Sequence, residues 1–199
     1  KSITLGVNPV SSILEQWMAN ATGIAGVDLF DSGLIYETLA WETYLIDDDA
    51  DQNYSTQAVI DQTEQFWEEE ITGRFDELGI SFALENNNEW YYGLSINVPF
   101  YRYDSRYYYS ESGFQGDSIR GFEWFEEFTN RGVGVNAKLG VIYRPVSSFR
   151  VGLSLWTPSW LFIDQTYYTE IITEYRSATD LSAAYAPTGS FNYMIQIIF

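Results

Sequence analysis

Apolar and polar residues alternate along several stretches of this chain, and the alternation predicts β-strands. The clearest stretch runs from Tyr92 to Phe100, where the even-numbered residues are apolar or aromatic and the odd-numbered ones are Gly, Ser, Asn and Pro. Val133 to Tyr143 alternates in the same way, with its odd-numbered residues apolar or aromatic. Side chains return to the same face of a strand with a period of two. Each of these strands is therefore predicted to have one apolar and one polar face.

The same alternation predicts about seven strands, separated by segments of unequal length. They cover residues 2–7, 33–46, 79–84, 92–109, 133–143, 149–155 and 191–199. Glu85 to Glu89 and Arg144 to Ser148 are predicted as short polar turns. Long loops are expected at 47–73, at about 110–130 and after residue 155. Short turns on one rim and long loops on the other are typical of a transmembrane β-barrel, so the predicted fold class is an all-β, antiparallel barrel.

One short helix is predicted within the loops. Ser12 to Glu15 forms a capping box, which marks a helix start, and Gly23 closes the segment. Ile13, Leu14, Trp17 and Met18 share one face of this helix. Such an apolar patch is a candidate binding surface for a lipid-like ligand. The alternative is that the patch packs against neighbouring loops. A further helical turn is predicted near residues 65–68.

A strand with its flanking segments occurs twice, at a constant offset. Gly93 and Gly152, like Pro99 and Pro158, are 59 residues apart. Each copy is a polar turn, a strand with an apolar face, an aromatic cluster and a polar loop, an order that matches the cross-section of a bilayer. Ten residues separate Tyr91 from Tyr101, and ten tilted strand residues rise about 23 Å, close to the height of a lipid-facing band. The alternative is a large soluble sheet whose aromatic residues fill a core.

Composition excludes several classes of function. The chain has 199 residues and a net charge of −18, so nucleic acid is an improbable partner. It contains no histidine and no cysteine, which excludes Ser-His catalysis, disulfides and thiolate metal sites. No apolar run approaches the roughly 20 residues of a transmembrane helix. No enzymatic activity, catalytic residue or cofactor is predicted.

An acidic stretch resembles the start of a calcium loop but lacks its other requirements. Asp47, Asp49 and Asp51 have the right spacing, but Gln52 stands where glycine is needed and Ala58 where the last glutamate is needed. A solvated acidic loop is therefore the better interpretation, and no metal site is predicted.

Several segments together resemble the OmpP1/FadL/TodX family of outer-membrane transport proteins, in its Bacteroidetes branch. The resemblance covers most of the chain in the same order. It is carried by residues 39–47, 90–96, 131–145 and 149–154 and by Thr157-Pro158.

The resemblance implies a 14-stranded barrel in the bacterial outer membrane, surrounded by outer-membrane lipid. It also implies passive transport of hydrophobic small molecules, such as long-chain fatty acids, past an N-terminal plug. This chain departs from that pattern, because it has about seven strands and lacks the plug. Residues 1–199 are therefore expected to be an interior part of a single barrel domain. A binding or adhesion barrel and a general porin are the alternative functions. No motif identifies the ligand or the oligomeric state.

Three further residues are singled out by their position on the predicted strands. Lys138 is the only lysine besides Lys1, and strand parity places it on the polar face beside Asn136. It is a candidate cation for a ligand carboxylate, with an ion pair to an acidic residue as the alternative. Pro99 and Pro158 cannot donate a ladder hydrogen bond, so each is predicted to kink its strand or leave it locally unpaired.

Overall fold

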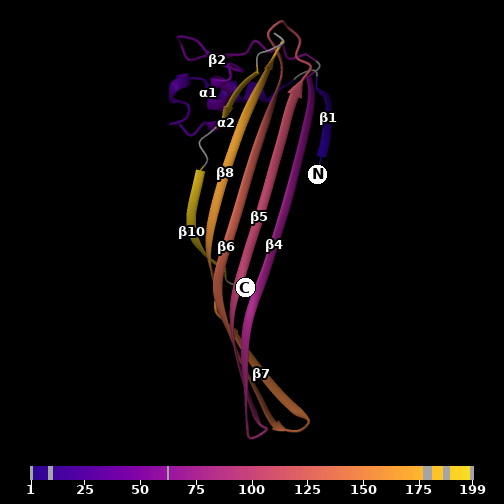
Figure 1. Ribbon diagram of the computed structural model, residues 1–199, viewed down its shortest axis with the longest axis vertical. Helices are drawn as coiled ribbons and strands as arrows, with labels where there is room; N and C mark the ends of the chain where they lie inside the picture. The colour runs from indigo at the N-terminus through magenta and orange to yellow at the C-terminus, as the bar shows by residue number, and fades with distance from the viewer. Residues whose placement is uncertain (1, 9–10, 62, 177–180, 186–188, 198–199) are drawn as a thin grey trace. The chain divides into compact units, whose positions relative to one another are not determined.

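Antiparallel β-strands make up most of the protein in the computed structural model, which describes residues 2–8, 11–61, 63–176, 181–185 and 189–197 (Figure 1). Eight strands of this part form one sheet in the order β1-β4-β5-β6-β8-β10, with β7 paired to β6 and β9 paired to β8. Their bounds are β1 Ser2–Asn8, β4 Thr63–Asn86, β5 Trp90–Ser112, β6 Ile119–Val146, β7 Phe149–Trp156, β8 Ser159–Tyr175, β9 Leu181–Tyr185 and β10 Gly189–Ile197. The predicted all-β, antiparallel class is thus confirmed for the described residues.

Short elements fill the segment between β1 and β4. They are α1 Ile13–Ala21, the 3₁₀ turn η1 Gly26–Asp28, α2 Ile35–Glu42, and the two-stranded pair β2 Asp47–Asp48 with β3 Tyr54–Ser55. The predicted helix is confirmed as α1, because the Ser12 side chain caps it by accepting the Leu14 N–H. No helix among the described residues has the length and apolar character needed to cross a membrane.

The chain divides into two compact units. Unit 1 consists of Lys1–Ile71, Ser105–Phe128 and Tyr167–Gly189, and unit 2 of Thr72–Asp104, Thr129–Thr166 and Ser190–Phe199. In unit 1 the two helices pack on strand residues and form a buried core. The Trp17 ring lies 5.6 Å from that of Phe122 and 5.9 Å from that of Trp124, between centroids. Burial of such large rings supplies much of the packing energy of unit 1.

Two carboxylates tie the helices of unit 1 to its strands. Glu111 is fully buried and accepts hydrogen bonds from Ser12 Oγ, from the Ile13 N–H at 3.0 Å and from Tyr109 OH at 2.6 Å. Glu126 Oε2 accepts from Tyr36 and from Tyr167, each at 2.9 Å. Burial raises the pKa of Tyr167 far above its ordinary value, so this hydroxyl stays protonated, and able to donate, well into the alkaline range.

The strand expected at residues 33–46 is wrong. The structure has α2 there, followed by a turn at Thr43 and Tyr44. Leu39 and Ala40 are buried in the core of unit 1. These apolar residues, which suggested an alternating strand, therefore lie on the buried side of a helix. A short apolar run does not by itself distinguish a helix from a strand.

The expected long loops at 47–73, about 110–130 and after residue 155 are predicted too long, because strands occupy part of each segment. β4 begins at Thr63, and its first residues pair with β1. The helical turn expected near residues 65–68 is therefore part of a strand. Only residues 113–118 separate β5 from β6, and β8 occupies residues 159–175. The strands continue because their polar stretches still alternate with aromatic residues, which pack on the helices in unit 1. β10 reaches Ile197, and its predicted continuation to Phe199 lies outside the described residues.

The two predicted short turns are confirmed. Between β4 and β5, the Glu89 N–H donates to the Asn86 carbonyl at 3.2 Å. The two residues in between, Asn87 and Asn88, have φ angles of 54° and 56°. Asparagine tolerates this left-handed conformation, which a tight hairpin turn requires at both central positions. Three residues, 87–89, separate β4 from β5, and two, Ser147 and Ser148, separate β6 from β7.

Candidate functional site: a polar network on one face of unit 2

The sheet of unit 2 has two chemically different faces. One face, here the apolar face, exposes large hydrophobic side chains. They include Leu78, Ile80, Phe82 and Leu84 of β4, Leu94, Ile96 and Phe100 of β5, Val133, Val135 and Leu139 of β6, and Phe149, Val151, Leu153 and Leu155 of β7. The opposite face, here the polar face, carries mainly Gly, Ser, Asn, Lys and Glu, together with the aromatic side chains of Phe75 and Trp156. The alternation predicted for residues 92–100 and 133–143 is thus confirmed.

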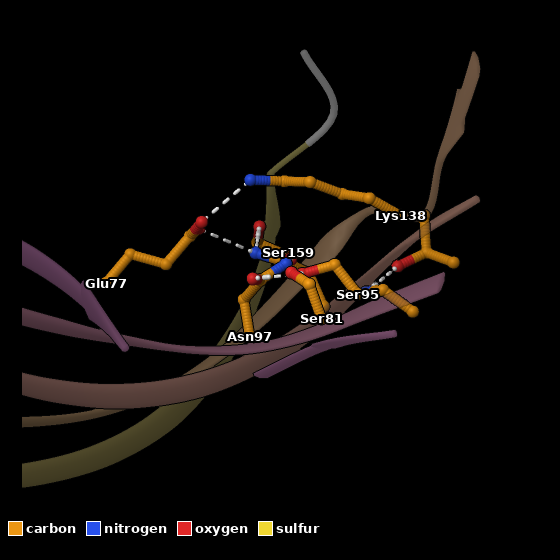
Figure 2. A network of polar contacts seen from close by, with 9 residues as sticks. Glu77, Ser81, Ser95, Asn97, Lys138 and Ser159 are labelled. Atoms are coloured by element: carbon orange, nitrogen blue, oxygen red, sulfur yellow. Dashed lines mark hydrogen bonds and ion pairs between the residues drawn. The ribbon is translucent and has the colours of Figure 1, made fainter. Parts of the chain in front are cut away.

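A chain of hydrogen bonds crosses the polar face from β4 to β8 (Figure 2). Ser81 Oγ donates to Ser95 Oγ at 3.0 Å, and Ser95 Oγ donates to Asn97 Oδ1 at 2.8 Å. Asn97 Nδ2 donates to Asn136 Oδ1 at 2.8 Å, and Asn136 Nδ2 donates to Ser159 Oγ at 3.0 Å. Side chains from four strands therefore form one network, with Asn97, Asn136 and Ser159 buried.

Glycine makes room for this network at Gly79 of β4. A Cβ at this position would lie 2.4 Å from Asn97 Oδ1, so any larger residue would displace the amide. Asn97 is therefore fixed by its two hydrogen-bond partners and by the backbone of β4.

An ion pair ends the network. Lys138 Nζ lies 2.7 Å from Glu77 Oε1, and Asn136 Nδ2 donates to Glu77 Oε2 at 3.2 Å. Figure 2 shows the Lys138 side chain extended toward Glu77. The ammonium also lies 6.0 Å from the ring centroid of Trp156, at the limit of a cation–π contact. The ion pair predicted as the alternative role of Lys138 is present.

A cavity of about 210 Å³ adjoins the ion pair. Its lining combines the polar groups of the network with the apolar side chains of Phe75, Trp156 and Pro158. One ammonium, one carboxylate, an amide and hydroxyls meet apolar surface here. Such a lining is able to hold the polar end of an amphiphilic molecule by hydrogen bonds while its apolar part contacts the rings.

The cavity lies at a β-bulge between β7 and β8. Trp156 pairs with Lys138 across the ladder, whereas Ser159 bonds to Asn136. Four residues, 156–159, thus lie beside three, 136–138, and the extra residue is the definition of a bulge. Within it, the Thr157 N–H donates to the Ala137 carbonyl, and the Ala137 N–H donates to Thr157 Oγ1, both at 2.9 Å. Pro158 therefore interrupts the strand, as predicted.

Pro99 behaves differently from its counterpart. It is buried within β5, which continues through it without a break. The expected kink or unpairing at Pro99 therefore does not interrupt the strand.

The residues of the predicted loop patch occupy the core of unit 1. Leu14 and Trp17 are buried, while Ile13 and Met18 are partly buried against the same core. The packing alternative thus describes where these side chains lie. Ligand binding by this helix stays a prediction.

The sequence did not single out Glu77, Asn97, Trp156 or Ser159 as site residues. Glu77 lay before the predicted start of its strand at residue 79. Strand parity places both Asn97 and Asn136 on the polar face, and this shared face is a signal that the sequence does contain. Ser159 reaches that face only because of the bulge, which no periodicity reveals.

No protein-family model, curated protein or solved structure matches this chain. Among the described residues, no group of three or more acidic side chains is arranged to hold a metal ion.

Proposed function

We propose that this chain is part of an outer-membrane β-barrel that passively carries hydrophobic small molecules, such as long-chain fatty acids, across the bilayer. In this proposal the apolar face of unit 2 contacts lipid and the polar face lines the lumen. The barrel closes with further strands, up to the 14 that the family resemblance implies.

The observation that supports the proposal is the continuous exposure of the apolar face. Leu84, Leu153 and Phe82 are 72%, 66% and 63% exposed, although they are large hydrophobic side chains. A soluble monomer rarely exposes a contiguous apolar patch that spans several strands, because its contact with water is unfavourable. A lipid environment removes this cost. Alternating apolar and polar faces on tilted antiparallel strands are the arrangement of membrane barrels.

The polar network supports a role in transport over a general porin. A porin constriction needs charge that faces a water channel, but Lys138 is compensated by Glu77. The cavity beside them combines this ion pair and the amide and hydroxyl groups of the network with the aromatic surface of Phe75 and Trp156. This mixture suits an amphiphile with a carboxylate better than a hydrated ion. The bulge at Thr157 and Pro158 interrupts the wall beside the cavity and is a candidate exit point.

Liposomes that contain the complete barrel, with the further strands that close it, test the proposal. Uptake of a fluorescent long-chain fatty acid should exceed that of protein-free liposomes, while entry of a small sugar should not increase. Sugar entry would support a porin instead. Insertion without uptake of either solute would leave an adhesion barrel as the better function.

Lys138→Met sharpens the test, with a fatty acid and the alcohol of the same chain length as matched substrates. Loss of the ammonium should slow entry of the carboxylate and leave that of the alcohol unchanged, because only the carboxylate gains a charge-assisted hydrogen bond. An equal effect on both substrates would show that Lys138 supports the barrel and does not contact the ligand.

A further inference from the structure

A second cavity, of about 700 Å³, lies on the apolar face of unit 2, away from the polar network. Side chains of β5, β6, β8 and β10 line it. Besides Tyr101, Gly132 and Ile163, the lining has four apolar residues, Phe100, Val133, Phe162 and Met194, and three charged ones, Arg102, Arg131 and Asp164. All seven of these side chains are exposed. We call this the arginine groove.

The groove has an apolar row beside a charged row. Asn97 bonds to Asn136 and Asp104 bonds to Thr129, and a continuous ladder between these contacts sets Phe100 opposite Val133. The same register sets Arg102 opposite Arg131. Two residues along a strand separate the rows, a distance of about 7 Å. An amphiphile lying along the strands would therefore meet apolar side chains with its chain and charged ones with its headgroup.

The charged row sets two arginines opposite each other on β5 and β6. Like charges directly opposite each other on neighbouring strands destabilise a sheet. Arg102 is partly compensated, because its Nε lies 2.6 Å from Asp104 Oδ2, but a guanidinium has further N–H donors. Within the part of the chain that the structure describes, the side chain of Arg131 makes no hydrogen bond or ion pair, although the carboxylate of Asp104 attracts it from a greater distance. An anion shared by the two guanidinium groups would accept from the N–H donors that Asp104 does not use.

We propose that the arginine groove binds a membrane lipid with a phosphate headgroup. Arg102 and Arg131 hold the phosphate, and Phe100, Val133, Phe162 and Met194 contact an acyl chain. Guanidinium groups bind phosphate oxygens through paired N–H donors, which suits phosphate better than a neutral headgroup. Asp164, across from Arg131 on β8, disfavours an anion on its own side and directs the phosphate toward β5. The proposal rests on the proposed membrane location of the apolar face.

Binding of phosphatidic acid and of a diacylglycerol with the same acyl chains tests the proposal, measured by native mass spectrometry in a neutral detergent. Phosphatidic acid should bind at least about tenfold more tightly. Arg102→Gln with Arg131→Gln should remove this preference and leave diacylglycerol binding unchanged. The control variant, Arg144→Gln with Arg150→Gln, changes two arginines in the turn region between β6 and β7 and should keep the preference.

Equal binding of both lipids by the wild type, or an unchanged preference in the Arg102/Arg131 variant, would overturn the proposal. Displacement of the lipid by inorganic phosphate alone at a similar concentration would also overturn it, because the site would then hold a free anion. Fatty-acid uptake by the same proteins separates the two proposals. Uptake without a phosphate preference refutes the groove alone, and a phosphate preference without uptake refutes the transport function alone.

Discussion

The two copies of the repeated segment have similar sequences but different strands. The first copy forms β5, a strand of 23 residues that runs through Pro99 without a break. The second copy is divided at Thr157 and Pro158 into β7, with 8 residues, and β8, with 17. The proline occupies the same position in both copies, but the strand is interrupted only in the second. The residues on both sides of the proline differ, since Val98 and Phe100 in the first copy correspond to Thr157 and Ser159 in the second.

The bulge changes which face the downstream residues occupy. Upstream of the prolines, Leu94 and its counterpart Leu153 both lie on the apolar face. Downstream, Phe100 stays on the apolar face, whereas its counterpart Ser159 bonds to Asn136 on the polar face. One extra residue shifts the alternation by one, and every following side chain changes face. The similarity of two sequences thus predicts the same faces only as far as their ladders stay in register.

The largest expected effect comes from a charge placed on the apolar face in either copy. Leu94→Arg and Leu153→Arg should each lower the free energy of unfolding in a bilayer by about 2–4 kcal/mol, because both side chains would put a guanidinium in lipid near the midplane. Ser95→Arg and its counterpart Ser154→Arg, on the polar face, should lower it much less. Reversible unfolding in lipid vesicles measures all four. Equal losses on both faces would contradict the membrane interpretation.

A smaller loss is expected where β8 approaches β6 beside the bulge. A Cβ on Gly134 would lie 2.3 Å from the Trp160 carbonyl oxygen, whereas a Cβ on Gly140 of the same strand would meet nothing within 4 Å. Gly134→Ala should therefore destabilise the protein by about 1–3 kcal/mol, as an overpacked site does. Gly140→Ala is the matched control, and denaturant titration should show little change. Similar values for both variants would mean that β8 does not pass this close to β6.

Much of unit 2 could be predicted from the sequence, and most of unit 1 could not. In unit 2 one face is apolar and the other polar, so a period of two in residues such as 92–100 reveals the strand directly. In unit 1 the strands pack aromatic side chains on helices and carry charges on their other face. Glu64, Glu68 and Glu70 of β4 were therefore assigned to an acidic loop. The pairing of Lys138 with Glu77 depends on sheet register, which a single sequence does not contain.

The smallest expected effect tests why the second copy bulges. Thr157→Val gives the second copy the residue that the first copy has at Val98, with nearly the same shape but no hydroxyl. The Ala137 N–H would then lose its acceptor, so the free energy of unfolding should fall by about 0.5–1.5 kcal/mol, the usual net value of one hydrogen bond. Faster hydrogen exchange at the Ala137 amide should accompany the loss.

The reciprocal change, Val98→Thr, adds a hydroxyl to an unbroken ladder and should leave exchange in β6 unchanged. If Thr157→Val is as stable as the wild type and the Ala137 amide stays protected, the bulge does not depend on this hydroxyl. Pro158 and the close packing at Gly134 would then be the features that hold it.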